Sequence, residues 1–571
     1  VSLSGNVVKI TGDGDLNDII ITGAPNGEIT VESGSDATTI NGLTDPVNVA
    51  TQSDLRIVMN GGDDIVTFNG NGGDLQRDLY FDGGSGDNTF ELAGGYTIGR
   101  RLTIINAAGF DTISLDEVTA ADAYISNGSG GSIVTVSNST FGTGITGLTI
   151  VNGAGGAFAN DLVIDTVTIG RSLLIQNASG DATITIDGAT IGEDLTIRNG
   201  PGNATITLGT SVANDIADDF FIRLGNGTNS IGITGGTVGG GVQLTGGTGG
   251  DSYIFDGVAI DENLTGQLAG GDNSVTLNAA DVGLTVNITS THGNQTFVAT
   301  DGAIGGRLQV TNGNGDHLFE LGTLGLLTVG QQVIIRNGKS SAAIGTTLTL
   351  EEIDVAGNFS ILNGNGDHLL QVGAAGGVAT IGGTLNMNSL NGDQDVSVER
   401  AVIGQDLWIQ NGTATAGSSV NVGVTTAVTV GRDMRIRYGS GGSTSTVNAV
   451  TISRNFFLTA QSGDDVATLE GTLSGDLTVE GTTNFDFGLG GDTLNLGTDT
   501  SAATFLNGFV HARMGYGDDT VLVGESTIFG DSYFFEGNFG FDTITVVNDT
   551  AFDVSNAVAA GRVRGFEDVN N

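Results

Sequence analysis

Two consecutive 22-residue segments of this sequence match in residue type almost position by position. They are Thr168–Ala189 and Thr190–Ser211. In both, apolar residues stand at the sixth, eighth, seventeenth and nineteenth positions, namely Leu173, Ile175, Ile184 and Ile186 in the first and Leu195, Ile197, Ile206 and Leu208 in the second. Alternation with a period of two places apolar side chains on one face of a strand, and the Asn, Gly and Asp residues between them favour turns. Each segment is therefore predicted to form strand, turn, strand, turn.

The same frame continues through almost the whole chain. The 22-residue pattern begins again along the chain and gives about 23 repeats. The second repeat, from Ala24, matches the pattern weakly and carries Ile29 and Val31. Because one repeat cannot bury its own apolar face, neighbours must stack and share backbone hydrogen bonds. The predicted fold is all-β, a parallel β-helix (β-solenoid) of about 22 residues per coil, continuous over residues 1–550. Residues 551–571 are predicted to form a partial cap or an assembly segment.

The solenoid is expected to be right-handed, because the chain lacks the hexapeptide repeat typical of short-period left-handed solenoids.

Two further positions of the repeat also have structural explanations. Position thirteen is usually glycine, as in Gly86 and Gly180, which indicates a backbone with φ above zero. Position ten is often asparagine, as in Asn152 and Asn177, and stacked asparagines predict a ladder of side-chain hydrogen bonds.

Composition restricts the possible partners. The 64 acidic residues outnumber 19 basic ones and give a net charge of −45, so nucleic acid and anionic membranes are disfavoured as partners. No apolar run is long enough for a transmembrane helix, so no membrane span is expected. The 97 glycines without a collagen triplet favour a repeat array over ordinary globular domains. The absence of cysteine excludes a disulfide framework.

Several turn segments resemble pieces of the RTX nonapeptide of secreted, calcium-binding bacterial proteins. They are Asn60-Gly-Gly-Asp-Asp-Ile-Val, Gly83-Gly-Ser-Gly-Asp-Asn-Thr-Phe, Gly490-Gly-Asp-Thr-Leu, Gly515-Tyr-Gly-Asp-Asp-Thr-Val and Gly540-Phe-Asp-Thr-Ile. RTX repeats recur every nine residues, whereas the Gly-Asp turns of this chain recur about every 22. The resemblance implies a repetitive secreted protein of the bacterial cell surface with degenerate calcium-binding turns.

A calcium role can also be argued from charge. Stacked coils bring the aspartates of successive turns about one strand spacing apart, where their repulsion is relieved by a hard divalent cation with oxygen ligands. The residues predicted to bind calcium are Asp63, Asp64, Asp87, Asp464, Asp465, Asp518 and Asp519. The alternative is that these aspartates are solvated turn residues.

Catalysis has little support in the sequence. Two of the four histidines, His317 and His368, share one repeat position and are expected to be stacked surface side chains. A lyase that acts on an acidic polymer needs a cluster of cationic side chains to stabilise the anionic enolate intermediate. The nearest candidates are Arg432, Arg435 and Arg437, of which the last two are expected to point outward. Trp408, the only tryptophan, also falls on an outward position, where it could stack on a sugar or be partly covered by neighbouring side chains.

The sequence therefore predicts a non-enzymatic extracellular structural protein. It would be a β-solenoid subunit of a bacterial surface fibre, stalk or sheath that assembles head to tail, with cell-surface polysaccharide as a second possible partner. The alternative is a carbohydrate-active or carbohydrate-binding β-helix protein, similar to polysaccharide lyases or glycosidases.

Overall fold

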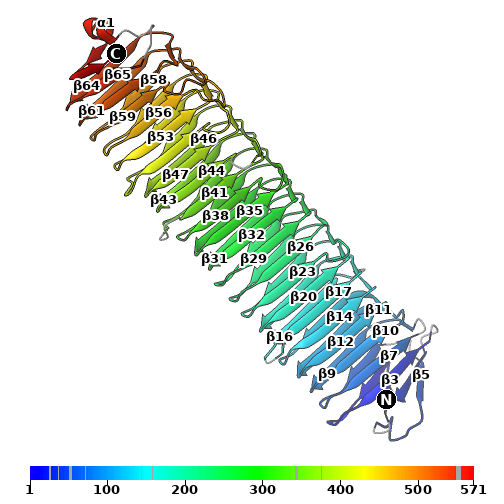
Figure 1. Ribbon diagram of the computed structural model, residues 1–571. Helices are drawn as coiled ribbons and strands as arrows, with labels where there is room; N and C mark the ends of the chain where they lie inside the picture. Colours follow the sequence, from blue (N-terminus) through cyan, green and yellow to red (C-terminus); the bar gives the residue numbers. More distant parts are fainter. Residues whose placement is uncertain are drawn as a thin grey trace. The chain divides into compact units, whose positions relative to one another are not determined.

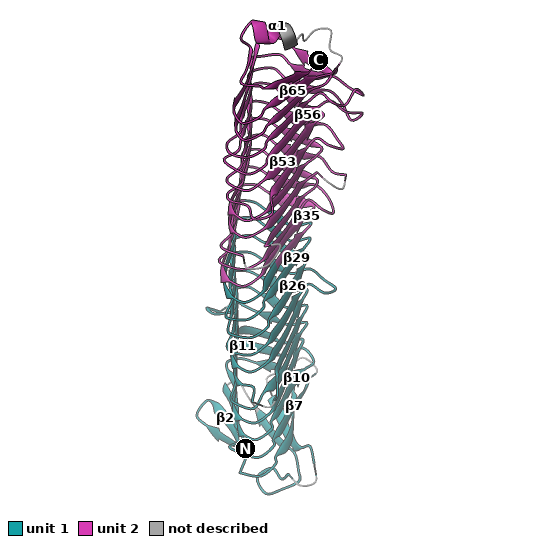
Figure 2. Cartoon of the chain, turned by 60° about the vertical axis from the view of Figure 1, so that its left-hand side comes forward, with its two compact units in different colours: residues 1–274, 279–283 teal, residues 275–278, 284–571 magenta. Residues whose placement is uncertain are grey.

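The computed structural model is a parallel β-solenoid of about 22 turns, with a spacing of about 23 residues (Figure 1). It describes residues 1–24, 28–35, 38–50, 54–70, 73–142, 144–156, 158–340, 345–373, 376–547 and 554–570. The chain divides into unit 1 (Val1–Ser274 and Ala279–Gly283) and unit 2 (Val275–Asn278 and Leu284–Asn571), coloured separately in Figure 2. The predicted all-β parallel solenoid is thus confirmed, and the strand β32 (Asn273–Asn278) spans the division.

Each coil of unit 1 contributes strands to three columns that run parallel from coil to coil. The long strands are β2 (Val7–Thr11), β6 (Asp54–Val58), β9 (Leu79–Ser85), β11 (Thr97–Ala108), β13 (Thr119–Asn127), β16 (Leu148–Ala154), β19 (Leu173–Ser179), β22 (Leu195–Asn199), β25 (Phe220–Leu224), β28 (Val242–Thr245) and β31 (Leu264–Gly270). The strands of the second column are β3 (Asp18–Gly23), β7 (Ile65–Gly70), β10 (Thr89–Ala93), β12 (Asp111–Asp116), β14 (Ser132–Ser137), β17 (Asn160–Asp165), β20 (Ala182–Asp187), β23 (Ala204–Leu208), β26 (Ser230–Thr234) and β29 (Ser252–Asp256). The short strands are β8 (Asp74–Leu75), β15 (Thr140–Phe141), β18 (Thr168–Ile169), β21 (Thr190–Ile191), β24 (Asp215–Ile216), β27 (Thr237–Val238), β30 (Ala259–Ile260) and β33 (Asp281–Val282).

Unit 2 repeats the same three columns. Its long strands are β34 (Val286–His292), β37 (Leu308–Thr311), β40 (Val333–Arg336), β43 (Phe359–Asn365), β46 (Leu385–Asn391), β49 (Leu407–Gln410), β52 (Met434–Arg437), β55 (Phe456–Thr459), β58 (Thr483–Asp486), β61 (Val510–Tyr516) and β64 (Tyr533–Phe539). The second column holds β35 (Gln295–Thr300), β38 (His317–Leu321), β41 (Thr346–Leu350), β44 (His368–Val372), β47 (Gln394–Val398), β50 (Ser418–Val422), β53 (Ser443–Asn448), β56 (Val466–Glu470), β59 (Thr493–Leu496), β62 (Thr520–Val523) and β65 (Thr543–Val546). The short strands are β36 (Gly302–Ile304), β39 (Leu327–Val329), β42 (Ile353–Val355), β45 (Ala379–Ile381), β48 (Ala401–Ile403), β51 (Val428–Val430), β54 (Val450–Ile452), β57 (Leu477–Val479), β60 (Thr504–Leu506) and β63 (Thr527–Phe529).

The predicted inward positions form the core. The eight apolar residues at positions six, eight, seventeen and nineteen of the two matching repeats are at most 1% exposed, and Leu173 pairs with Leu195 as Ile184 pairs with Ile206. Thr185, between two buried isoleucines, is only half-buried. Burying such side chains contributes about 1.5–3 kcal/mol each, so the inward columns supply most of the driving force for stacking.

The predicted asparagine ladder is present. In unit 1 the side-chain amide of each Asn donates to the amide oxygen of the next coil, at N–O distances of 2.9–3.2 Å, through Asn106, Asn127, Asn152, Asn177 and Asn199. In unit 2 the same bonds join Asn312, Asn337 and Asn363. These asparagines are buried, so the ladder satisfies polar groups that water cannot reach.

The beginning of unit 1 differs from the prediction. The segment from Ala24 does not form a parallel second coil, because β4 (Glu28–Ser33) runs antiparallel to β3 and β5 (Val47–Ala50) runs antiparallel to β4. In addition β1 (Ser2–Ser4) runs antiparallel to β2, which pairs in parallel with β6. The edge strands of the first coil are therefore covered by chain that folds back on it, which hides backbone groups that would otherwise invite pairing.

The end of unit 2 combines a helix with two short strands. The helix α1 (Val554–Ala559) precedes β66 (Val563–Arg564), which pairs in parallel with β64, and β67 (Asp568–Asn570), which pairs in parallel with β65. Of the segment 551–571 predicted as a cap or assembly element, Ala551–Asp553 and Asn571 lie outside the described residues. The six-residue α1 is too short to cross a bilayer, and the described part of the chain holds no helix that could do so.

Candidate functional site

The exposed aspartates of the Gly-Asp turns bind the backbone of the next coil. Asp63 Oδ1 accepts the N–H of Asp87 at 2.8 Å, and Asp87 Oδ1 accepts the N–H of Phe110 at 2.7 Å. Asp464 and Asp518 do the same for Gly491 and Phe541, both at 2.8 Å. Each of these predicted calcium ligands therefore has one carboxylate oxygen committed to the fold and one left for other partners.

The glycine before each of these aspartates is required for the coils to stack. Gly86 has a φ of 119°, and a Cβ there would overlap the carbonyl oxygen of Gly62 in the preceding coil. Any side chain would thus be strained and would push the coils apart. This explains why Gly-Asp is repeated without invoking a ligand.

The second aspartate of the doubled turns lies inside the solenoid. Asp64, Asp465 and Asp519 are at most 2% exposed, although the sequence suggested that all seven predicted ligands stand in turns. Asp64 Oδ1 accepts two hydrogen bonds from Asn17, through its backbone N–H and its side-chain amide. Each of these buried residues directly precedes a strand of the second column (β7, β56 or β62) and lies two residues before an inward side chain of that strand, so it points into the core as well.

Four such carboxyl groups stack in consecutive coils of unit 2. The backbone N–H of Asp465 donates to Asp492 Oδ1 at 2.8 Å, that of Asp492 to Asp519 Oδ1 at 2.8 Å, and that of Asp519 to Asp542 Oδ1 at 3.0 Å. The Oδ2 atom of each of the four is buried without a hydrogen-bond partner among the described residues. We call Asp465, Asp492, Asp519 and Asp542 the buried acid column.

Burial sets the protonation of this column. Loss of hydration raises the pKa of Asp465 to about 7, with the charge of Asp492 adding to the effect, and raises that of Asp492 to about 6. The pKa of Asp519 is raised to about 7 and that of Asp542 is also raised, again mainly by burial. Stacked carboxylates in a poorly solvated interior cannot all carry charge, so the column holds protons near neutral pH.

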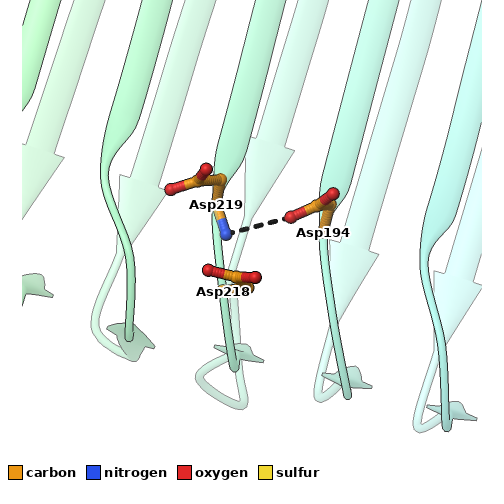
Figure 3. A group of neighbouring side chains, drawn as sticks. All are labelled: Asp194, Asp218 and Asp219. Carbon is orange, nitrogen blue, oxygen red and sulfur yellow. Dashed lines mark hydrogen bonds between the residues drawn. The ribbon is translucent and has the colours of Figure 1, made fainter.

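One cluster of three acids lies close enough to share a metal ion (Figure 3). Oxygens of Asp194, Asp218 and Asp219 all lie within 4.8 Å of one another, and among the described residues no other such group of three is found. Asp194 and Asp219 precede the paired strands β22 and β25, and Asp194 Oδ1 accepts the N–H of Asp219 at 3.2 Å. Asp219 Oδ1 also accepts the N–H of Gly241 at 2.8 Å.

This cluster was not predicted. The sequence shows Asp218-Asp219 as a doubled acid, but Asp194 joins them only through the register between two coils. A hard cation such as Ca²⁺ would fit such a set of carboxylate oxygens. None of the seven predicted ligands belongs to a three-acid group in the described part of the chain, so calcium binding at those positions stays a prediction.

The histidines of the repeat are buried, which corrects the expectation of surface side chains. His317 and His368 are 3% and 2% exposed, and burial lowers the pKa of both. His368 Nδ1 accepts the N–H of Thr346 at 3.1 Å, so its Nε2 donates to Gly364 O at 3.2 Å. A neutral imidazole with both nitrogens bonded to backbone is a structural element of the column.

The arginines considered for catalysis are mostly engaged. Arg432 pairs with Asp406 at 3.7 Å, and Arg435 pairs with Asp433 at 3.3 Å while lying over the ring of Phe457. Arg435 and Arg437 do point outward from β52, as predicted. An anionic intermediate would have to compete with these acids for two of the three guanidinium groups.

The chain matches no protein-family model, no curated protein and no solved structure.

Proposed function

We propose that the protein is an extracellular structural protein, a β-solenoid subunit of a bacterial surface fibre, stalk or sheath. The observation that carries this proposal is the continuity of the stabilising contacts. In each unit the core columns, the asparagine bonds and the aspartate-to-backbone bonds pass from coil to coil. Such a protein works through its stiffness and its repeated surface, and it needs no catalytic site.

Head-to-tail self-association is part of the proposal. The strands β1 and β67 each have one side that is unpaired among the described strands, and their side chains are exposed. Strand edges of this kind pair readily with a second chain, and a heterologous contact between two different edges propagates into a filament.

Lysine substitutions on the edge strands β1 and β67 test head-to-tail assembly. Leu3 on β1 is 62% exposed and Val569 on β67 is 37% exposed, so Leu3→Lys and Val569→Lys should leave the fold intact. We expect the parent protein to form filaments in electron micrographs with calcium present, and each variant to stop their growth. Leu3 and Val569 pair with the buried Val8 and Ile544, and a lysine on this side of an edge strand blocks pairing with a second chain. Leu473→Lys, at a 92% exposed position away from both edges, is the matched control. A parent protein that stays monomeric at high concentration would refute the assembly.

Calcium is proposed as the cofactor of this structure. The support is the free carboxylate oxygen of the turn aspartates and the three-acid cluster, in a chain with a net charge of −45. A bound divalent ion would offset repulsion between coils.

A second candidate function, carbohydrate binding, is favoured by one observation. Trp408 is 42% exposed on the outward face of β49 and lines a hollow of about 370 Å³.

A further inference from the structure

The hollow beside Trp408 crosses four neighbouring long strands of unit 2. The strands β40, β43, β46 and β49 pair in register, so that Ile334, Ser360, Asn386 and Trp408 form one outward column. Ser360 and Asn386 are smaller than the residues at the two ends, and the surface is therefore sunk between Ile334 and the indole. Four strands about 4.8 Å apart make this groove roughly 14 Å long.

One side of the indole belongs to the groove. Trp408 follows Asn386 in the column, and both line the hollow. The next residue, Arg435, lies outside it and covers the ring of Phe457 at 4.9 Å. An exposed indole that ends a polar groove offers a flat apolar surface to a ligand lying in that groove.

The rest of the lining is polar and mostly uncharged. Gln332 and Asn386 contribute amides, which both donate and accept hydrogen bonds. Asn358 contributes its NH2 group, since its Oδ1 already accepts the N–H of Thr384 at 2.9 Å. Asp406 is occupied by Arg432 and by the backbone N–H of Asp433. Arg336 is exposed at the far end from Trp408 and has no ion pair with a described acid, so its guanidinium can donate to a ligand.

We propose that this groove binds a neutral oligosaccharide. Pyranose rings have an apolar face for the indole and hydroxyl groups that pair with amides and with Arg336. The length of the groove suits several sugar units along the stack of coils. The identification of such a glycan as a partner at a cell surface rests on the proposed function, whereas binding itself does not.

Two other ligand classes fit less well. A polyanionic glycan would meet the repulsion of a protein with a charge of −45, and one free arginine does not offset it. An apolar peptide would bury the side-chain amides of Gln332 and Asn386 and the NH2 group of Asn358 without partners, which is costly.

The test uses the fact that the chain has one tryptophan. Its fluorescence reports on this groove alone. The full-length protein is titrated with the hexasaccharides of cellulose, starch, mannan and chitin, and with hexagalacturonate as the anionic probe. At least one neutral hexasaccharide should shift the emission in a saturable manner, and hexagalacturonate should not.

Three variants locate the binding. Asn386→Leu should raise the Kd about tenfold or more, because a sugar hydroxyl loses its hydrogen-bond partner. This variant keeps Trp408, so its binding can still be followed by fluorescence. Trp408→Ala, measured by calorimetry, should abolish binding. Tyr516→Ala removes a comparably exposed aromatic ring elsewhere in unit 2 and should leave the Kd unchanged.

The outcomes are separable from those of the assembly experiment. No response to any neutral hexasaccharide, preference for hexagalacturonate, or a Kd unaffected by Asn386→Leu would overturn the proposal. A monomeric protein that still binds a neutral hexasaccharide would refute assembly and leave the groove standing.

Discussion

Carboxyl and carboxamide groups occupy equivalent buried positions in different coils. Gly86-Asp87-Asn88 and Gly517-Asp518-Asp519 have the same backbone pattern, and both Asn88 and Asp519 are 1% exposed. Asn88 Nδ2 donates to Gly86 O at 3.0 Å, whereas Asp519 Oδ2 has no partner. A protonated Asp519 could make the bond that Asn88 makes, so the interior tolerates the neutral acid far better than its anion.

The buried acid column should make unit 2 less stable at alkaline pH. The folded pKa values of about 6 to 7 for Asp465, Asp492 and Asp519 exceed an unfolded value of about 3.8. The stabilisation of the neutral form is therefore complete below the unfolded pKa and is lost as pH rises through 6 to 7. The exposed neighbours Asp464 and Asp518 and the tail residue Glu567 add negative charge and oppose ionisation further.

Asp519→Asn tests this. We expect the variant to raise the thermal midpoint of unfolding at pH 8 and to change it little at pH 5, measured by scanning calorimetry. Asp518→Asn is the control, since it removes an exposed charge and keeps the oxygen that accepts the N–H of Phe541. Equal responses of the two variants at pH 8 would contradict a role for burial.

The burial of these acids could have been predicted from the alternation of inward and outward residues along each strand. Asp465, Ala467 and Leu469 alternate with outward residues, so Asp465 shares the inward face. The turn-like appearance of Gly-Asp-Asp concealed this, because the first aspartate is indeed a turn residue. Asp194 and Asp219 could also have been aligned from the sequence, because both stand at the fifth position of repeats that start at Thr190 and Asp215. That Asp218 reaches the same cluster depends on the conformation of the turn, which the repeat does not give.

At the scale of the elements, the 22-residue period predicted the strands and the columns, because every coil buries side chains at the same positions against the coils next to it. Alternation does not tell parallel from antiparallel pairing, so β4 with Ile29 and Val31 was assigned to a coil although it runs antiparallel to β3. The same alternating sequence suits a parallel and an antiparallel strand, so the direction of pairing depends on which strand lies beside it.

The asparagine ladder should be a large local contribution to stability. Asn152 accepts from Asn127 and donates to Asn177, both at 2.9 Å, in a buried site. Asn152→Ala leaves a donor and an acceptor unpaired, which should cost about 2–4 kcal/mol. Because repeat arrays unfold in parts, the change should be measured as faster hydrogen exchange of β13, β16 and β19.

Two controls make this prediction specific. Gln176→Ala removes an exposed amide from β19, directly before the buried Asn177 of the ladder, and should change exchange much less. Asn152→Ser restores a hydroxyl of the kind that Ser290 and Ser389 supply at this position in unit 2, and should recover part of the loss. Exchange in β13, β16 and β19 that is unaffected by Asn152→Ala would mean that core packing alone holds the coils.

At the scale of the whole molecule, the net charge of −45 opposes folding unless cations offset it. Monovalent salt screens this repulsion everywhere, whereas a bound divalent ion acts at particular carboxylates. Calcium should therefore raise the thermal midpoint more than sodium chloride of equal ionic strength, and a chelator should reverse the gain.

Two double variants identify which carboxylates respond. In Asp63→Asn/Asp87→Asn the amide oxygens can still accept the N–H groups of Asp87 and Phe110, so charge is removed while these backbone contacts are retained. In Asp194→Asn/Asp218→Asn the three-acid cluster keeps a single carboxylate. If calcium occupies the Gly-Asp turns, the first pair should blunt the response to chelation, and if it occupies the cluster, the second pair should. A midpoint that chelator leaves unchanged in the parent protein would exclude both sites as contributors to stability, and the turn aspartates would then act only through the hydrogen bonds that join one coil to the next.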